Sequence, residues 1–186
     1  MLIKTLIPNM EIRTARLYVS PRTRILAQDE LETRALSYLL KDTICPEVGI
    51  AIAAREMAAL IQGPCTLVPV PSHTGDTSAN IRLCQAIAAQ VEGGGKVADI
   101  LGRAHEVDSS CKRHKAGSQP LTIAEHSICR KGKKMVAINS LFFVDNTTTT
   151  GTTLEACKAA LGGFGRGLAF TDAWQSVCLR ETRKVA

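Results

Sequence analysis

Six threonines and one glycine fill positions 147–153 in the stretch VDNTTTTGTT. Threonine hydroxyls can donate hydrogen bonds, and Gly151 lets the backbone wrap closely around a small ligand. An apolar run, Leu141–Val144, precedes the stretch, and a segment with helical spacing, Leu154–Leu161, follows it. The first backbone N–H groups of a helix and the positive end of its dipole favour an anion. The stretch therefore predicts a phosphate site, with Asp145 as a hydrogen-bond acceptor in the same cavity.

Two other interpretations use the same residues. A Walker-type nucleotide loop ends in Lys-Ser or Lys-Thr, and the stretch contains no lysine, which disfavours ATP hydrolysis. The second interpretation is a threonine N-cap, with further threonines favouring the turn, and it needs no ligand. Spacing alone leaves this alternative open.

The elements around the stretch predict an α/β protein. The expected strands are Cys65–Pro71, Lys96–Leu101, Leu141–Val144 (with Met135–Ile138 as part of the same strand or its partner) and Gly167–Phe170. The expected helices are Asp29–Leu40, Pro46–Ile61, Thr77–Val91 and Leu154–Leu161. Within residues 1–22, LIKTLI and EIRTARLYV are expected to pair as a hairpin. The expected apolar face of the first helix consists of Leu31, Ala35, Leu36, Leu39 and Leu40.

The order strand–helix–strand–loop–strand–helix–strand favours a mainly parallel sheet flanked by helices. All six threonines are then expected in a strand-to-helix turn at the carboxyl end of a strand, where ligands of such sheets lie. Gly102–Pro120 is a long polar stretch, which compact domains rarely keep unless it is functional or disordered. The basic run Lys112–Lys115 inside it is, without context, typical of a solvated surface patch.

Composition restricts the classes of partner that the protein can bind and the compartment in which it is expected. The net charge of +6 and pI of 9.1 suit anionic partners such as nucleotides, phosphates or nucleic acid, although surplus surface lysine and arginine explain them as well. No helix-turn-helix or aromatic-rich RNA-binding surface is apparent. The seven cysteines are odd in number and lack CxxC spacing, which argues against a zinc ribbon or a disulfide framework. The N-terminus is a poor signal peptide, and the longest apolar run, Val48–Ala54, is too short to span a bilayer. We expect a cytoplasmic protein with no membrane partner.

The stretch VDNTTTTGTT resembles the binding signature for 5-phosphoribosyl pyrophosphate (PRPP) of type I phosphoribosyltransferases. That signature is an apolar strand, two acids, two spacer residues, Thr-Thr-Gly, one residue and Thr. The resemblance implies that Asp145 and Asn146 hold the 2′- and 3′-hydroxyls of the ribose. It also implies that the 5′-phosphate is bound by Thr149, Thr150, Gly151, Thr152 and Thr153. Asn146 departs from the pattern, because it supplies no negative charge beside a developing ribosyl cation.

Two more segments are similar to the ComF-like branch of this family. In LVPVPSHTGDTSANIRLCQAIA, residues 67–88, the resemblance implies a pyrophosphate loop made of Ser72, His73, Thr74 and Gly75, with Asn80 in the helix start behind it. ILGRAHEVDSSCKRHKAGSQPLTIAEH, residues 100–126, resembles the segment before the PRPP strand. In the wider family that region is a flexible catalytic loop with basic side chains. The candidates in this chain are Lys112, Arg113 and Lys115, together with His114.

The resemblance implies a type I phosphoribosyltransferase-like single domain, with a small N-terminal hood and flanking elements in residues 1–64 and the core in residues 65–186. The implied reaction transfers 5-phosphoribosyl from PRPP to a nitrogenous base and releases pyrophosphate. Mg²⁺ is implied as cofactor, held mainly by PRPP with no direct protein ligand, or with Asp145 acting through water. A homodimer is also implied. The alternative is a PRPP- or nucleotide-sensing regulator of weak or absent turnover that contacts nucleic acid, motivated by Asn146, the net charge and the basic loop.

Overall fold

The computed structural model describes residues 2–4, 10–21, 24–42, 44–109, 113, 116, 118–132 and 140–173. The strands are β1 (Leu2–Lys4), β2 (Ile12–Leu17), β3 (Cys65–Pro69), β4 (Gly95–Val97), β5 (Leu101–Arg103), β6 (Ile128–Arg130), β7 (Leu141–Thr148) and β8 (Arg166–Asp172). The helices are α1 (Gln28–Leu39), α2 (Glu47–Ala58), α3 (Ser78–Ala88), the 3₁₀-helix η1 (Ala124–His126) and α5 (Thr152–Ala160).

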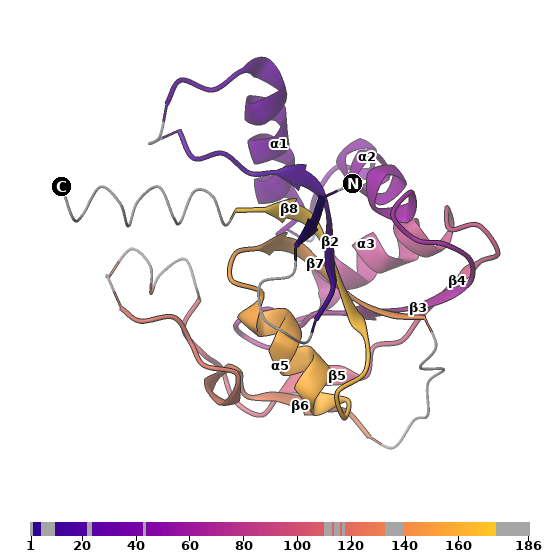
Figure 1. The fold of residues 1–186 in the computed structure, drawn as a ribbon, viewed down its shortest axis with the longest axis vertical. Coiled ribbons are helices and arrows are strands. Elements are labelled where there is room, and N and C mark those ends of the chain that lie inside the picture. The colour runs from indigo at the N-terminus through magenta and orange to yellow at the C-terminus, as the bar shows by residue number, and fades with distance from the viewer. Residues whose placement is uncertain are drawn as a thin grey trace.

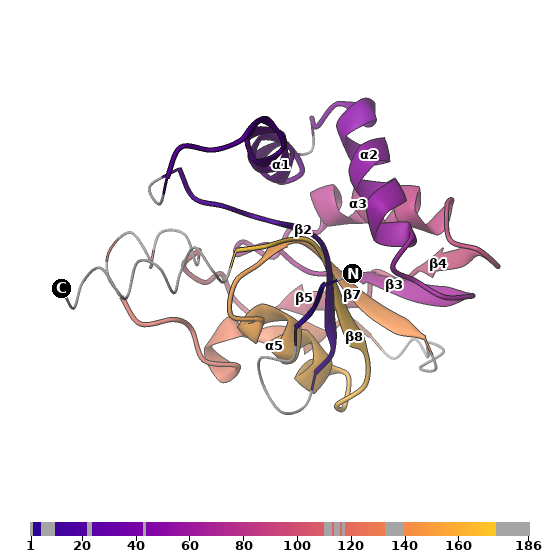
Figure 2. The same ribbon diagram turned by 45° about the horizontal axis from the view of Figure 1, so that its top comes forward.

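The main sheet has the strand order β1-β2-β8-β7-β3-β4, and β5 pairs with β6 in a separate two-stranded sheet. The strands from β2 to β4 in this order are parallel, and only β1, at the edge, is antiparallel. Helices α1, α2 and α3 lie on one side of the main sheet, while α5 and the β5–β6 pair lie on the other (Figure 1, Figure 2). The predicted α/β class with a mainly parallel, helix-flanked sheet is confirmed.

The apolar run of β7 forms a strand because both of its faces are covered. Phe142 and Val144 belong to the core cluster beneath α2 and α3, whereas Leu141 and Phe143 belong to the cluster beneath α5. This alternation follows the two-residue period of a strand. The first cluster also takes in Met57 of α2, so residues before and after position 64 share one core.

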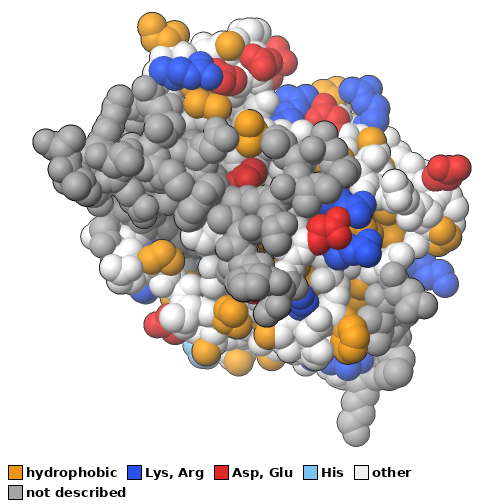
Figure 3. Space-filling view, in the orientation of Figure 1, with side chains coloured by type: hydrophobic (Ala, Val, Ile, Leu, Met, Phe, Trp, Pro, Cys, Tyr) orange, Lys and Arg blue, Asp and Glu red, His pale blue; other side chains and the backbone are white. Residues whose placement is uncertain are grey.

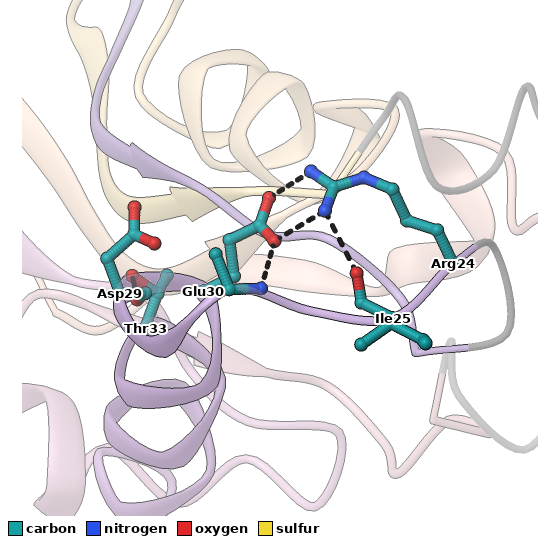
Figure 4. A network of polar contacts seen from close by, with 6 residues as sticks. Arg24, Ile25, Asp29, Glu30 and Thr33 are labelled. Carbon is teal, nitrogen blue, oxygen red and sulfur yellow. Dashed lines mark hydrogen bonds and ion pairs between the residues drawn. The ribbon is translucent and has the colours of Figure 1, made fainter.

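Helix α1 begins in a polar network at its first turn (Figure 4). The Glu30 carboxylate accepts the backbone N–H of Ala27 at 2.9 Å and also pairs with Arg24. This arrangement satisfies an N–H group that the start of a helix leaves without an intrahelical partner, and it places negative charge where the helix dipole favours it. Thr33 Oγ1 donates to the carbonyl of Asp29 at 2.8 Å, which ties the first turn to the second.

The apolar face predicted for this helix is wrong in part. Leu31 and Leu39 are exposed, whereas Thr33 and Ser37 are buried together with Leu40. The two hydroxyls satisfy their hydrogen bonds on carbonyl groups of their own helix, so burying them leaves no polar group unpaired. The side of α1 that faces the sheet is therefore largely polar.

Other boundaries also differ from the prediction. The single strand expected at Lys96–Leu101 is divided between β4 and β5, which belong to different sheets. The intervening backbone is bound on both sides, because Ala98 N–H donates to Leu67 and the Ile100 carbonyl accepts from Lys131. The predicted hairpin at the N-terminus is confirmed, with Leu2 opposite Thr14 in the β1–β2 pair. Met135–Ile138 lies outside the described residues.

None of the described helices has the length and the apolar character that crossing a bilayer requires.

Candidate functional site

The threonine stretch spans three kinds of local structure. Strand β7 continues to Thr148, because Thr147 and Thr148 pair with Thr171 and Asp172 of β8. The prediction that all six threonines lie in the turn is therefore wrong. The turn itself consists of Thr149, Thr150 and Gly151, and α5 begins at Thr152 followed by Thr153. Threonine is β-branched, so an adjacent strand with a matching register readily extends β7 through it.

Gly151 occupies the N-cap position of α5 with φ of +84°, a conformation that side chains disfavour. An added Cβ would lie 2.7 Å from Ile12 Cδ1, so the end of the Ile12 side chain would have to move to admit a side chain here. On either side of this glycine, the Oγ1 atoms of Thr150 and Thr152 lie 2.7 Å apart. The turn is thus held in one shape, with hydroxyl groups and the first N–H groups of α5 close together.

Asp145 lies within β7, on the sheet face that carries α5 and the β5–β6 pair. Its carboxylate accepts the backbone N–H of Asn146 at 2.8 Å. Burial raises the pKa of Asp145, while hydrogen bonds from Asn146 and Asn80 and the positive charge of Lys41 act in the opposite direction. Asn146 follows on the same strand, and its carbonyl accepts from Thr171 Oγ1 at 3.3 Å. Consecutive strand residues present their side chains to opposite faces, so Asp145 and Asn146 approach the strand end from different sides.

The loop at Ser72–Gly75 lies beside Asp145 because β3 and β7 are neighbours. Val70 N–H donates to the Val144 carbonyl at 3.0 Å, which carries the pairing up to the start of the loop. Inside the loop, Gly75 N–H donates to the Ser72 carbonyl at 3.0 Å, and Gly75 has φ of +91°. The hydroxyls of Ser72 and Thr74 lie 2.9 Å apart. The loop is a closed, exposed turn whose polar groups point outward.

Two side chains connect this loop to Asp145. Asn80 Nδ2 donates to the Val70 carbonyl at 2.8 Å, and Asn80 also hydrogen-bonds Asp145. The Arg103 guanidinium donates to the carbonyls of Ser72 at 2.5 Å and Pro71 at 3.3 Å, and its charge is felt by Asp145. Burial lowers the pKa of Arg103, although the negative charge of Asp145 favours the charged guanidinium. The turn after β7 and the loop after β3 thus converge on one edge of the sheet.

His126 and Cys157 lie near the Arg103 side chain. The His126 carbonyl accepts from Arg103, and its buried Nδ1 atom has no hydrogen-bond partner in the part of the chain that the structure describes. Burial, with the nearby charge of Arg103, lowers the pKa of His126 to about 4. Burial also raises the pKa of the Cys157 thiol, which therefore stays protonated.

A cavity of about 500 Å³ opens on the outer side of the loop after β3. Its lining consists of His73, Thr74, Glu106, Val107, Asp108 and Ser109. Val107 N–H donates to the His73 carbonyl at 3.0 Å, which holds the two segments together. Because Glu106 and Asp108 contribute carboxylates, a bare anion is disfavoured here and an anion carrying a metal ion is suited better.

The basic loop is described only at Arg113 among its predicted catalytic residues; Lys112 and Lys115 lie outside the described residues, as does His114. Arg113 Nε donates to the Gln119 carbonyl at 2.9 Å, and Arg113 NH1 lies 3.8 Å from an Asp108 carboxylate oxygen. These contacts tie Arg113 to its own segment and to the wall of the cavity.

The sequence pattern assigns no role at the site to Lys41 or Arg103, and it places Asn80 only behind the loop at Ser72–Gly75. Lys41 lies two residues after the end of α1, far from Asp145 in the chain, and no local pattern marks it. Arg103 and Asn80 both fall in the segments that resemble ComF-like proteins, and that resemblance was the available signal for them.

Within the described residues, no group of three or more His, Cys, Asp or Glu side chains could hold a metal ion. The oxygen donors near the site, Asp145 and Asn146, are of the type that Mg²⁺ prefers, but they are too few to hold it alone. A magnesium ion would fit here only if a ligand brought most of its coordination shell, so this cofactor remains a prediction.

The fold and the site define an α/β protein with a polar, threonine-lined turn at the carboxyl edge of its parallel sheet. Comparison with models of known protein families, with curated proteins and with solved structures finds no match.

Proposed function

We propose that this chain is a type I phosphoribosyltransferase-like enzyme that binds PRPP at the carboxyl ends of β7 and β3. It would transfer the 5-phosphoribosyl group to a nitrogenous base and release pyrophosphate. The observation that carries the proposal is the convergence of the turn at Thr149–Gly151, the Asp145 carboxylate and the loop at Ser72–Gly75. PRPP has three parts that need such groups: a 5′-phosphate, a ribose and a pyrophosphate.

The 5′-phosphate would occupy the N-terminus of α5. Backbone N–H groups and the helix dipole favour a dianion there, and the Thr150 and Thr152 hydroxyls can turn from each other toward its oxygens. The positive φ of Gly151 brings the backbone close to the ligand. These contacts are local to the turn, so they would bind any phosphomonoester of suitable size.

The ribose would lie against Asp145, whose carboxylate can accept hydrogen bonds from the two ring hydroxyls. Cleavage of the C1–O bond gives the ribose ring oxocarbenium character, as in glycosidic cleavage. A half-buried carboxylate such as Asp145 stabilises that positive charge more strongly than a fully exposed one, because the local dielectric constant is lower. Asn146 can hold a hydroxyl group but adds no charge.

The pyrophosphate would lie over the loop at Ser72–Gly75. Mg²⁺ bound to PRPP would supply charge neutralisation of the leaving pyrophosphate. Glu106 and Asp108, which line the cavity beside His73, favour a pyrophosphate that carries such a cation. Arg103 holds the Pro71 and Ser72 carbonyls, so the loop keeps its shape when the ligand binds or leaves.

The test is release of pyrophosphate from PRPP and Mg²⁺ in the presence of a panel of purines, pyrimidines and pyridine carboxylates. Base-dependent release by the wild-type chain, and its loss in Asp145→Ala, is the expected result. Glu92→Ala serves as the control, because it removes an exposed carboxylate in the turn before β4, at the opposite, amino-terminal edge of the sheet. Absence of pyrophosphate release with every base of the panel would contradict the proposed transferase activity.

A second function is favoured by one observation, the uncharged Asn146 next to Asp145. A PRPP sensor would bind the ligand, raise the melting temperature and leave PRPP intact. The nucleic-acid contact proposed with it has less support, because Lys and Arg side chains lie beside Asp and Glu side chains on the face shown in Figure 3. A measured affinity for nucleic acid that falls steeply with salt concentration would support this contact.

A further inference from the structure

A second cavity, of about 450 Å³, lies beside α5, where this helix contacts η1. Its lining consists of Ile123, just before η1, of Glu155, Lys158 and Ala159 on α5, and of Gly163 in the turn after α5. The proposed PRPP site uses none of these residues. The volume is in the range of small-molecule sites. We call this space the α5 cavity.

Glu155 is the buried charged residue of the α5 cavity. It is only 8% exposed, and none of the described residues forms a hydrogen bond or an ion pair with its carboxylate. Its backbone N–H donates to the Gly151 carbonyl at 3.0 Å, so the regular backbone of α5 fixes the position of the residue. A carboxylate that is withdrawn from water without a partner is costly. A bound cation would remove that cost.

The helix dipole offers a simpler explanation for an acid at this position. Glu155 lies in the first turn of α5, where the positive end of the dipole favours a negative charge. An exposed side chain gains this interaction as well, so the dipole does not explain why the residue is buried in the wall of a cavity. The burial instead favours a ligand that pairs with the carboxylate.

The rest of the wall suits the apolar body of a ligand. Ile123 is 44% exposed, and Phe164, which follows Gly163 in the chain, is 52% exposed. Exposed apolar side chains of this size that gather at a cavity are typical of binding sites. Gly163 also lies just past the carboxyl end of α5, where the helix dipole favours a positive charge.

Lys158 limits the charge that the ligand can carry. It lines the α5 cavity one turn after Glu155 and has a further interaction of its own. Its positive charge disfavours a second positive charge on the ligand. A metal ion is disfavoured too, because Glu155 is the only carboxylate among the described lining residues and hard cations need several oxygen ligands.

We propose that the α5 cavity binds a small organic ammonium ion with an apolar body. The ammonium group would pair with the Glu155 carboxylate, and the apolar body would lie against Ile123 and Ala159. The proposal does not depend on the proposed phosphoribosyltransferase function, because the binding is measured without PRPP.

The experiment is an NMR titration of the ¹⁵N-labelled chain with cyclohexylamine, cyclohexanol and cyclohexanecarboxylate. The three probes share one ring and are a cation, a neutral molecule and an anion at pH 7. Cyclohexylamine should bind the wild-type chain at least about tenfold more tightly than cyclohexanol, and the carboxylate should bind most weakly. The amide signals that shift should be those of residues 155–163.

Glu155→Gln keeps the size of the side chain and removes its charge, so it should abolish the preference for the amine over the alcohol. Glu92→Gln is the matched control, because it makes the same change at an exposed carboxylate in the turn before β4 and should alter neither affinity. Ala159→Leu tests the cavity without changing a charge. Ala159 is exposed and leucine suits a helix, so this variant should unfold in urea like the wild type. Its larger side chain should weaken the binding of both the amine and the alcohol.

Equal wild-type affinities for the amine and the alcohol would overturn the proposal, as would a preference that survives Glu155→Gln. Absence of binding by every probe, or amide shifts confined to another surface, would also overturn it. If Glu155→Gln fails to fold, amine binding that Ala159→Leu leaves unchanged would contradict the site by itself.

Discussion

Thr150 Oγ1 and Thr152 Oγ1 lie 2.7 Å apart across Gly151, at the start of α5. The backbone N–H of Thr152 also points to Thr150 Oγ1, at 3.4 Å. In the absence of a ligand, these hydroxyls satisfy each other. A phosphate oxygen is a stronger, charged acceptor, so exchanging the hydroxyl pair for two charge-assisted hydrogen bonds favours binding.

The first prediction concerns Thr150→Val, which keeps the β-branched shape and removes the hydroxyl. PRPP affinity should fall at least about tenfold, because one hydrogen bond to a charged group contributes roughly 1.5–3 kcal/mol. The free energy of unfolding should change by less than about 1 kcal/mol, since the site is only half buried. Titration calorimetry and urea unfolding measure the two effects. Thr66→Val is the matched control, because Thr66 lies near the opposite, amino-terminal end of β3; a loss of affinity there would show that the effect is not specific.

The second prediction uses glycine. Gly151→Ala should destabilise the fold through two terms, about 1–2 kcal/mol for a side chain at positive φ and about 1–3 kcal/mol for the contact with Ile12. Gly63→Ala should show only the first term, because Gly63 has φ of +69° and open space around its Cβ position. Urea unfolding of both variants separates the terms.

Ile12→Val tests the contact directly, because it removes the Cδ1 atom that the new Cβ would meet. In that background the cost of Gly151→Ala should drop toward that of Gly63→Ala. Costs that simply add would show that Ile12 does not limit the space at the turn.

The third prediction follows from the raised pKa of Asp145. The folded chain holds the Asp145 proton more tightly than the unfolded chain, so stability from this group falls as pH rises above the ordinary aspartate pKa of 3.8. Asp145→Asn removes the charged form and keeps an oxygen that can accept the Asn146 N–H. The difference in free energy of unfolding between the variant and the wild type should therefore favour the variant more at pH 7 than at pH 4. PRPP binding should be lost. Urea unfolding at both pH values is the measurement, with Asp108→Asn as the control.

A variant of Asp145 that is destabilised equally at pH 4 and pH 7 would contradict this account. The carboxylate would then contribute to folding by its shape and hydrogen bonds alone. A gain in stability accompanied by a loss of binding is instead typical of a binding site that opposes folding.

The fourth prediction concerns His126, whose pKa is lowered to about 4. Its ordinary pKa is 6.5, so the unfolded chain binds the proton first, and stability is lost as pH falls from 6.5 to about 4. Over that window the loss from this group should approach about 3 kcal/mol. His126→Gln should flatten the acid limb of the stability curve, and substitution of the exposed His73 by Gln is the matched control. An acid limb identical in wild type and His126→Gln would place the acid sensitivity elsewhere.

Much of the fold follows from local pattern. The run Leu141–Val144 predicts a strand covered on both faces, and the helical spacing after Gly151 predicts α5; both are present. The strand extends to Thr148 because of its register with β8, which is a long-range pairing that no window of sequence contains. The 96–101 segment divides for a similar reason, since its two halves find partners in different sheets.

The site is predicted less completely than the fold. The Asp145 position and the glycine turn can be inferred from the order of residue types. The contacts of Arg103 and Asn80 with this edge, and the effect of the Lys41 charge on Asp145, depend on how distant segments pack. In α1 the side chains of Thr33 and Ser37 are buried where the pattern predicted Leu31 and Leu39. Their intrahelical hydrogen bonds allow these polar side chains to be buried. The spacing of apolar residues does not indicate which polar side chains can be buried in this way.

The last prediction concerns Asn146→Asp, which restores the second acid of the signature that the stretch resembles. A second carboxylate next to Asp145 would stabilise a ribosyl cation further, so base-dependent release of pyrophosphate should stay equal or rise at pH 8. The added negative charge should also raise the pKa of Asp145 and shift the acid limb of the kcat/KM profile to higher pH. Asn80→Asp is a useful comparison, because it also adds a carboxylate near Asp145 but removes the donor to Val70. Activity that appears only in Asn146→Asp would identify the wild-type chain as a PRPP-binding protein that has lost turnover at this single position. A fall of tenfold or more would instead show that the amide of Asn146 is itself required.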